Sequence, residues 1–499
     1  MNSEMFDKAK INFEEGIKYF QQEKYDLAEI SFLNSLKIIP DRLSTIGNLI
    51  KIYIKTYQTD KLNNILKKYE HLKHQKNISI GFAYKYYFEE KNNESINLCN
   101  KYLNDEELGH LAQDLLALNF KKKNNFLEAL KVYRNRLKEN KKNFMIYYNI
   151  GLLFFDLGKT NQANYFFKKS YKLNPRDYST IWNISLCCLT LKDFKKGFEF
   201  YEYRWKKKNA DKKKFQFIKF PENTKQLINK KILIWDEQGL GDTINFSRFV
   251  IQLLKFTKNI TLIVNKKLKN ILMNLDPEIK VIDYDDKFDN NFDYQIPICS
   301  LPKFLEIYSV NDIKFNKLNF EKKNLDNEAI KKDKLNIGVA WSGNPNYIYD
   351  RYRSITFNNF KKLFDFKNIN FIKLSQNSKN DEPIDYNLFK NLTDYGDRSL
   401  EDVAKIILNL DLVISTDTSI IHLAGILKVK SILLLNFNSD WRWFKDQSTT
   451  CWYPSIKIIK QEKFNSWKNV FELLKGELQN LIKKKRAVIT ALFKFFFRD

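Results

Sequence analysis

The sequence predicts two kinds of structure in one chain: an α-solenoid of helical repeats over residues 1–205, then an α/β region with two parallel sheets over residues 230–480. Three observations lead to this prediction. The first 205 residues read as one helix after another, without the alternation of apolar and polar residues that strands show. Within them, one spacing of small, aromatic and proline residues occurs twice. Beyond residue 230, short apolar runs alternate with helical stretches, which is typical of sheets covered by helices on both faces.

Composition and charge narrow the class of protein. The 499 residues are 43% hydrophobic and 15% aromatic, which excludes a disordered chain. Lys and Arg number 85 against 59 acidic residues, a net charge of +26. Such a charge is typical of proteins that bind nucleic acid or anionic lipid. Here the basic residues are spread over nearly the whole chain and no nucleic-acid motif occurs. We therefore interpret them as solvated surface residues that help attract an anionic substrate, and we expect no nucleic-acid partner.

The cysteines and the N-terminus indicate a cytoplasmic protein. The five cysteines are odd in number and fit no zinc spacing, so we expect reduced thiols in packed cores. The first ten residues are charged and contain no apolar signal segment. No run approaches the ~20 apolar residues that cross a bilayer, so we expect no membrane-spanning segment.

Two N-terminal segments carry the same five positions at the same spacings. In each, Ala follows Gly by twelve residues, an aromatic residue follows Ala by four, and Pro follows Gly by twenty-four. The two sets are Gly16, Tyr19, Ala28, Phe32 and Pro40, and Gly151, Phe154, Ala163, Phe167 and Pro175. They lie 135 residues apart, close to four periods of about 34 residues, which matches the tetratricopeptide pattern. Gly and Ala fit where the two helices of a repeat cross, the aromatic residues fill the space between repeats, and Pro ends the second helix.

Stacked repeats of this type form a superhelix whose concave face holds an extended peptide. The alternative is an array that only braces the next domain. We favour the binding interpretation, in which the repeats hold an acceptor protein or peptide.

The second half is predicted to contain two Rossmann-like lobes, residues 230–333 and 334–480, after a polar, Lys-rich linker or exposed connection at residues 206–229. Each lobe is expected to contribute four strands. They are Lys231–Trp235, Ile260–Val264, Lys280–Asp283, Asp293–Ile296, Leu335–Trp341, Asn370–Leu374, Asp411–Thr416 and Ser431–Leu435. Two such sets predict a cleft between the lobes, where ligands bind at the carboxyl ends of the strands.

The first strand of this region runs into the segment Glu237-Gln-Gly-Leu-Gly-Asp-Thr243. Gly239 and Gly241 permit a tight turn and a close approach of a ligand to the backbone. Asp242 would start the following helix. Its carboxylate has two interpretations, a cap of the helix N-terminus or a general base at the floor of the cleft. Spacing alone favours the cap.

A second strand ends in Trp341-Ser-Gly-Asn-Pro345, with Asp350 and Arg353 close behind. A loop of this composition exposes backbone amides, and an arginine beside it can bind a diphosphate bidentately. A plain turn with a surface arginine is an equal alternative at this stage.

A third strand, in the segment Asp411–Gly425, runs into a helix predicted to begin near Thr418. The free N–H groups of the first turn, the hydroxyls of Thr418 and Ser419 and the positive end of the helix dipole together suit a diphosphate. Asp417 and His422 are five residues apart, so a shared helical face is not assumed. A lone histidine such as His422 is more often structural. For a shared ligand site, we expect this turn to lie near the loop around residue 241.

Taken together and in order, these segments resemble the heptosyltransferase-like family nine of glycosyltransferases, which adopt the GT-B fold. They look still more like the bacterial fusions of tetratricopeptide repeats to such a domain. The resemblance covers roughly residues 190–480. Beyond the three segments above, it rests on Gly197 with Tyr201–Trp205, Asp293–Pro297, Ser300–Pro302, Leu374–Gln376, Asp440–Trp443 and Trp452–Pro454.

The resemblance implies a metal-independent, inverting transfer of a sugar from a nucleotide diphosphate to a hydroxyl, with no cofactor besides the nucleotide sugar. It implies an acceptor-side lobe at residues 230–333, a donor-side lobe at 334–480, and Asp242 as the base that deprotonates the acceptor. The implied donor contacts are Ser342, Asn344, Arg353, Ser375, Gln376, Asp417, Thr418, Ser419 and His422. Ser419 stands where heptosyltransferases usually carry Gly, which counts against a heptose donor and a lipopolysaccharide acceptor.

Residues 481–499 are basic and then apolar. They fit an amphipathic anchor in weak contact with a membrane surface or a packed terminal helix, and we favour packing. Three functions stay open: a protein-modifying glycosyltransferase, a binding scaffold whose transferase domain has lost its chemistry, and an envelope glycan or lipopolysaccharide transferase.

Overall fold

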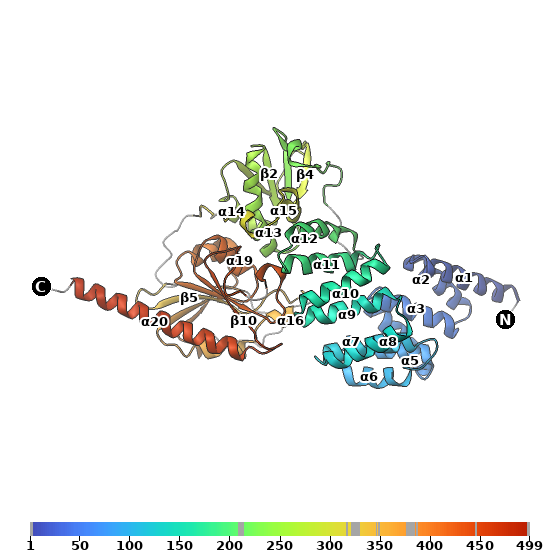
Figure 1. Cartoon of the computed structure of the whole chain (residues 1–499). Helices are drawn as coiled ribbons and strands as arrows, with labels where there is room; N and C mark the ends of the chain where they lie inside the picture. Colours follow the sequence, from blue (N-terminus) through green and yellow to red (C-terminus); the bar gives the residue numbers. More distant parts are fainter. Residues whose placement is uncertain are drawn as a thin grey trace. The chain divides into compact units, whose positions relative to one another are not determined.

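The computed structural model describes residues 3–207, 214–315, 318–320, 330–345, 347, 350–375, 385, 388–444 and 447–496, and their side chains except those of residues 3 and 488–496. The chain divides into two compact units, Met1–Leu153 and Phe154–Asp499 (Figure 1).

The described part of the first unit is helical. Its helices are α1 (Ser3–Gln21), α2 (Tyr25–Ile38), α3 (Leu43–Lys55), α4 (Thr59–Lys68), α5 (Lys76–Phe88), α6 (Asn92–Lys101), α7 (Gly109–Lys122) and α8 (Phe126–Glu139), followed by α9 (Phe144–Asp156), which reaches into the second unit. Consecutive helices pack as hairpins, with α1 on α2, α5 on α6 and α7 on α8. Helices α3, α5, α7 and α9 begin 33–35 residues apart, which confirms the predicted repeat.

The predicted helix crossing has a direct physical reason in the first hairpin. A Cβ atom added to Gly16 on α1 would lie 2.6 Å from the ring of Phe32 on α2. Phe32 and Ala28 are fully buried between the helices. Small and aromatic residues at this spacing therefore let two helices approach closely.

Three more helices of the predicted repeat region lie in the second unit: α10 (Thr160–Leu173), α11 (Tyr178–Thr190) and α12 (Phe194–Tyr201). Helices α11 and α12 form a further hairpin. Phe194 and Phe198 of α12 belong to the same buried apolar cluster as the strands that follow. The last predicted repeat thus shares a core with the α/β region, and the predicted boundary at residue 205 stays a prediction.

The N-terminal sheet has four parallel strands in the order β3-β2-β1-β4. The strands are β1 (Ile232–Trp235), β2 (Ile260–Val264), β3 (Ile279–Asp283) and β4 (Tyr294–Pro297), within a residue of their predicted positions. Alternate residues of β1 bury on opposite faces, as a strand's two-residue period requires. Ile232 and Ile234 join the core with α13 (Leu240–Gln252), whereas Leu233 and Trp235 pack against Ile218.

The C-terminal sheet has six parallel strands in the order β10-β9-β8-β5-β6-β7. The strands are β5 (Leu335–Ala340), β6 (Ile369–Lys373), β7 (Leu392–Asp394), β8 (Leu412–Ser415), β9 (Ser431–Leu435) and β10 (Ile456–Lys460). The sequence predicted four of them and missed β7 and β10, which form the two edges.

Helices cover both faces of the C-terminal sheet (Figure 1). Val413 of β8 packs into the core with α18 (Leu400–Ile407) and α19 (Ser419–Ile426). Its neighbours Leu412 and Ile414 pack on the opposite face, with Leu474 of α20 (Lys468–Phe496). The short helices α16 (Asp350–Arg353) and α17 (Phe357–Phe360) follow β5. The smaller helices of the N-terminal sheet are α14 (Lys266–Leu272) and α15 (Leu301–Phe304).

The predicted linker and tail both make contacts. In residues 214–229, Ile218 and Leu227 are buried, so this described part packs and does not run through solvent. The tail continues α20. Lys485 binds the Asp411 carboxylate at 3.0 Å, and Leu481 packs against the sheet core, as the packing interpretation predicts for residues 481–487.

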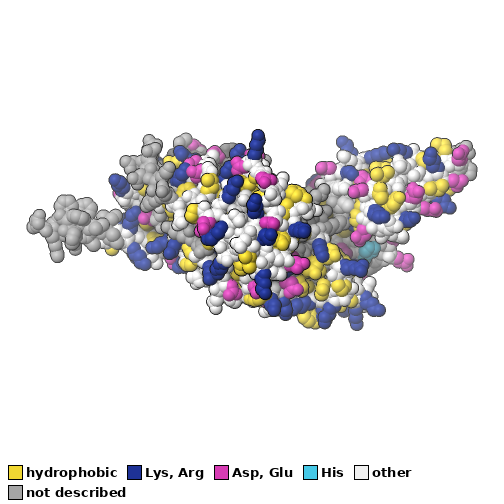
Figure 2. Space-filling view, turned by 90° about the horizontal axis from the view of Figure 1, so that it is seen from above, with side chains coloured by type: hydrophobic (Ala, Val, Ile, Leu, Met, Phe, Trp, Pro, Cys, Tyr) yellow, Lys and Arg dark blue, Asp and Glu magenta, His cyan; other side chains and the backbone are white. Residues whose placement is uncertain are grey.

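The surface agrees with the interpretation of the net charge. On the face shown in Figure 2, Lys and Arg side chains are scattered among apolar and acidic ones and do not gather in one stripe. Within the described ranges, no helix combines the length and apolar character that a membrane crossing needs.

Candidate functional site

Three hydroxyl groups lie at the carboxyl edge of the C-terminal sheet. Ser342, Ser375 and Thr416 follow the adjacent strands β5, β6 and β8. The strand ends are held in register, because the Thr416 N–H donates to the Ala340 carbonyl at 3.0 Å. All three hydroxyl oxygens are buried, and none has a hydrogen-bond partner among the described residues. Buried hydroxyls without partners cost free energy, so a cluster of them indicates a place for a polar ligand or water.

The loop after β5 brings Arg353 to the same edge. Its Nη1 donates to the Asp417 carbonyl at 2.8 Å, and its Nε donates to Asp350 Oδ1 at 2.9 Å. The guanidinium also lies 4.6 Å from the centroid of the Tyr347 ring. Arg353 is therefore held at the turn before α19, and the surface-arginine interpretation is wrong. Asn344 lies exposed on the same loop.

The turn into α19 has the predicted form. The helix begins at Ser419 with Thr418 as N-cap, and the Thr418 hydroxyl lies 3.1 Å from that of Ser415. Asp417 stands just before the N-cap and His422 is the fourth helical residue. Side chains at these two positions meet across the first turn. His422 Nε2 therefore lies 3.7 Å from Asp417 Oδ1, although spacing alone did not place them together.

His422 is buried and packs among aromatic rings. It is 5% exposed, its Nδ1 lies 3.0 Å from the Tyr453 hydroxyl, and its ring centroid lies 5.2 Å from that of Trp443. Such contacts are typical of a histidine with a structural role, the alternative that the sequence favoured for His422. Burial alone would raise the pKa of the Asp417 carboxyl, but the hydrogen bond and charge of His422, with the charge of Arg353, hold that pKa below its ordinary value.

Asp242 caps helix α13. The helix begins at Leu240 with Gly239 as N-cap, so Asp242 is its third residue. Its Oδ2 accepts the Gly239 N–H at 3.0 Å, the return half of a capping box. Asp242 thus caps the helix, from its third residue and not as the predicted N-cap, and the role as a base stays a prediction.

The turn before α13 does not depend on glycine as predicted, and of its two glycines Gly241 serves close packing. The residue with a left-handed backbone is Gln238, at φ 62°, whereas Gly239 is extended at φ −95°. A Cβ atom added to Gly241 would lie 2.8 Å from His422 Cδ2, so the missing side chain lets α13 approach α19. The loop around residue 241 and the turn at residue 418 therefore lie together, as a shared site requires.

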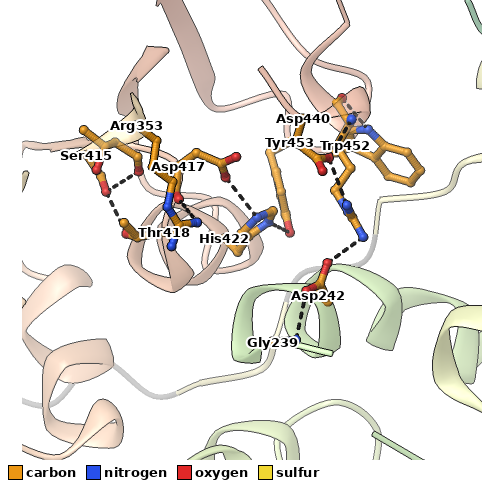
Figure 3. A network of polar contacts seen from close by, with 12 residues as sticks. Gly239, Asp242, Arg353, Ser415, Asp417, Thr418, His422, Asp440, Trp452 and Tyr453 are labelled. Carbon is orange, nitrogen blue, oxygen red and sulfur yellow. Dashed lines mark hydrogen bonds and ion pairs between the residues drawn. The ribbon is translucent and has the colours of Figure 1, made fainter. Parts of the chain in front are cut away.

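An ion pair links α13 to the segment between β9 and β10. Arg442 Nη2 lies 2.5 Å from Asp242 Oδ1, and Arg442 Nη1 donates to Asp440 Oδ1 at 2.9 Å. Figure 3 shows Asp242 on α13 facing Asp440, Tyr453 and the α19 turn. The segment Asp440–Trp443 belongs to the resemblance, but no role was predicted for its residues. Its signal was a charged pair within a cluster of tryptophans.

A second buried network fixes the end of β1. The Arg204 guanidinium donates from Nε and Nη2 to the two Glu237 oxygens at 2.8 and 2.6 Å, and from Nη2 to the Ser300 hydroxyl at 2.7 Å. Glu237 also accepts the Cys299 N–H at 3.1 Å. Arg204 follows α12, so this network fastens the last helical hairpin to the ends of β1 and β4.

The role of Gln376 and the expected absence of a metal both stay predictions. Gln376 lies outside the described residues, so its role stays a prediction. Across the ranges listed above, no group of three or more His, Cys, Asp or Glu side chains has the geometry to hold a metal ion.

Comparisons with known proteins add little to this geometry. No protein-family model matches the chain, and no curated protein does. Among solved structures, the Cut9–Hcn1 tetramer of the APC/C is 15% identical over 38% of this chain and 36% of its own, at a TM-score of 0.33. PilF of Pseudomonas aeruginosa is 10% identical over 41% and 93%, at 0.31.

The iron-containing dodecameric glycosyltransferase TibC of enterotoxigenic E. coli is 11% identical over 52% of this chain and 77% of its own, at a TM-score of 0.36. This chain thus spans about a third of the first structure's length and most of the other two. Scores this low carry no argument about fold or function, so both rest on the geometry above.

Proposed function

We propose that the chain is a glycosyltransferase of the GT-B type, which moves a sugar from a nucleotide diphosphate to a hydroxyl of a protein held by the repeats. The two parallel sheets would be its two lobes, with the donor bound at the carboxyl edge of the C-terminal sheet. The observation that carries the proposal is the set of three buried hydroxyls at that edge, which have no hydrogen-bond partner in the described part of the chain and lie beside Arg353 and the N-terminus of α19.

These groups suit a diphosphate in chemical type. A pyrophosphate accepts hydrogen bonds from hydroxyls, from the free N–H groups of a helix start and from a guanidinium. The hydroxyls of Ser342 and Thr416 would then gain partners that no described residue provides. As the sugar leaves, negative charge grows on the diphosphate, and Arg353 with the α19 amides would stabilise it without a metal.

Asp242 is the proposed base. It lies on α13, next to the proposed donor site, because Gly241 packs against His422 of α19. Its side chain is 24% exposed, with Oδ1 facing Arg442 and Oδ2 accepting the Gly239 N–H. A base must reach the acceptor hydroxyl within hydrogen-bond distance, so acceptor binding has to place that hydroxyl against the exposed part of this carboxylate.

One observation favours the second candidate, a binding scaffold that has lost transferase chemistry. Both oxygens of Asp242 already have protein partners, Gly239 and Arg442. A carboxylate used only as a cap and an ion-pair partner gives the same contacts. An envelope glycan transferase shares the donor site and differs only in its acceptor.

Turnover of a donor panel separates these candidates. Nucleotide sugars are incubated with the wild type and with Asp242→Ala, and release of the nucleoside diphosphate is followed together with donor binding. An enzyme binds one donor saturably and hydrolyses or transfers its sugar. In that case Asp242→Ala loses transfer and keeps donor binding. Saturable binding without any turnover supports the scaffold, and unchanged turnover in the variant removes Asp242 as base.

The acceptor is tested by removing the first compact unit. Deletion of residues 1–153 spares α11 and α12, whose side chains belong to the core of the second unit. If the repeats select a protein acceptor, the shortened chain loses protein modification and retains donor hydrolysis. Mass spectrometry of proteins from cells with and without the chain would show the transferred mass. Modification that survives the deletion intact contradicts acceptor binding by these repeats.

A further inference from the structure

We propose that Arg442 is a positioning residue that holds the Asp242 carboxylate in register with the donor site. The proposal rests on the proposed function and adds to it a residue outside the predicted site. Asp242 belongs to α13, which packs on the N-terminal sheet, whereas Arg442 belongs to the segment between β9 and β10 of the C-terminal sheet. The ion pair at 2.5 Å therefore connects the proposed base to the part of the chain that carries the proposed donor site.

The carboxylate is held at both oxygens. Asp242 Oδ1 faces the Arg442 guanidinium, and Oδ2 accepts the Gly239 N–H at 3.0 Å. The cap fixes the carboxylate relative to its own helix. The ion pair fixes it relative to the neighbouring sheet. With one contact on each oxygen, the plane of the carboxylate is set by both elements, and loss of Arg442 leaves only the cap.

Arg442 is itself immobilised, which a positioning group requires. Its side chain is 6% exposed, and its guanidinium carbon lies 4.5 Å from the centroid of the Trp441 ring and 5.2 Å from that of Phe246. Asp440 Oδ1 accepts from both its Nη1 and its backbone N–H, at 2.9 and 3.0 Å. The Arg442 carbonyl accepts the Trp452 indole N–H at 2.8 Å.

Charge explains why arginine stands here. Two carboxylates, Asp242 and Asp440, share one guanidinium, and Asp417 adds a third negative charge nearby. Burial, together with the Asp417 charge, raises the pKa of the Asp440 carboxyl even against the effect of Arg442. Without Arg442, the two carboxylates would face each other uncompensated. Asp242, which then keeps its cap to Gly239 but has lost its ion pair, is free to turn away.

Arg248 provides a matched control. Like Arg442 it is a buried arginine, but it lies on α13. It is 1% exposed, and its Nη1 donates to the Trp452 carbonyl at 2.5 Å. It therefore joins the same two parts of the chain through Trp452, apart from the pair of Asp242 and Arg442. Replacing Arg248 perturbs the packing between the sheets and leaves the base with both of its partners.

The test is a double-mutant cycle on turnover with Arg442→Gln and Asp242→Asn. Misplacement of a reacting group by about 1 Å costs up to ~100-fold in rate. We expect Arg442→Gln to lower kcat by about 10- to 100-fold with the donor KM within twofold, and Arg442→Lys to restore part of kcat. In the Asp242→Asn background, Arg442→Gln should cause no further loss. Arg248→Gln should act mainly on stability, with a lower unfolding midpoint and a smaller effect on kcat.

Several results would overturn the proposal. One is a kcat for Arg442→Gln within twofold of wild type. Another is an equal loss of kcat from Arg442→Gln with and without Asp242, because a purely structural residue acts in both backgrounds. A third is a donor KM that rises as much as kcat falls.

A second measurement decides the proposal even without turnover. The unfolding midpoints of the two single variants and the double variant show whether the side chains are coupled. Non-additive midpoint shifts are expected, and additive shifts mean that Arg442 does not hold Asp242. If no donor binds or turns over, the proposed function fails, and the midpoints alone then decide whether the pair exists.

Discussion

Replacing Gly241 with alanine places a methyl group against the His422 ring, where helices α13 and α19 meet. The added Cβ would lie 2.8 Å from His422 Cδ2, whereas ordinary contact begins at 3.4 Å, so the ring must retreat by about 0.6 Å. It cannot do so freely, because the Tyr453 hydroxyl holds its Nδ1 at 3.0 Å. Tyr453 is itself packed against Gly425, where an added Cβ would lie 2.5 Å from its ring.

The expected cost follows from two opposing effects. Overpacking a filled site costs about 1–3 kcal/mol. Alanine is favoured over glycine within a helix by up to ~1 kcal/mol, and less than this in the first turn, where residue 241 stands. We therefore expect Gly241→Ala to lower the free energy of unfolding by about 1–2 kcal/mol. Urea titration followed by tryptophan fluorescence measures this change.

Gly476→Ala is the matched control. Gly476 lies in helix α20, and no heavy atom comes within 4 Å of an added Cβ. This variant should raise the free energy of unfolding by about 0.5–1 kcal/mol. In a His422→Ala background, Gly241→Ala should lose its penalty, because the ring is gone. The reasoning is refuted if Gly241→Ala is as stable as wild type or if its penalty persists without the His422 ring.

Three other substitutions test the remaining interactions. Arg204→Met leaves the Glu237 carboxylate buried without its partner and should lower the free energy of unfolding by about 3–5 kcal/mol, measured by urea titration; a loss below about 1 kcal/mol contradicts a fully paired buried charge. Gly396→Ala would put a Cβ 2.1 Å from the Ser375 carbonyl oxygen, so we expect weaker binding of nucleoside diphosphate by calorimetry, and unchanged affinity counts against a donor site at this strand end. The pKa of Asp417 is lowered although burial opposes the shift. The stability that this carboxylate contributes is therefore present above its unfolded pKa of about 3.9 and is lost as the pH falls through the folded value. Asp417→Asn should lose less stability than wild type between pH 5 and pH 3, and an equal loss contradicts the assignment.

Much of the fold could be predicted because local patterns determine it. The strands β1, β2, β8 and β9 are short, apolar and buried on both faces, which gives a clear signal in one sequence. The edge strands escaped for physical reasons. Strand β7 has only three residues, and β10 reads Ile-Lys-Ile-Ile-Lys, with lysines that an edge position tolerates.

The site was predicted only where a strand end and a helix start adjoin in sequence. The α19 turn has both, so the start of this helix, predicted near Thr418, lies within one residue of its place in the structure. The partner of Asp242 could not be found in this way, because Arg442 lies 200 residues further along the chain and only the packing of α13 on α19 brings them together. Gly241 shows the same limit, since its need for a missing side chain comes from His422, on another helix.

Hydrogen exchange of the backbone amides, with and without a nucleoside diphosphate, tests the central claim most directly. The ligands are ADP, GDP, CDP and UDP, each added to the full-length protein. If the turn before α19 binds the diphosphate, one of them slows exchange in residues 416–421 and in the loop that follows β5, and leaves the first compact unit unchanged. Protection confined to the helical repeats, or no protection at saturating concentrations of all four, contradicts a donor site at the carboxyl edge of the C-terminal sheet.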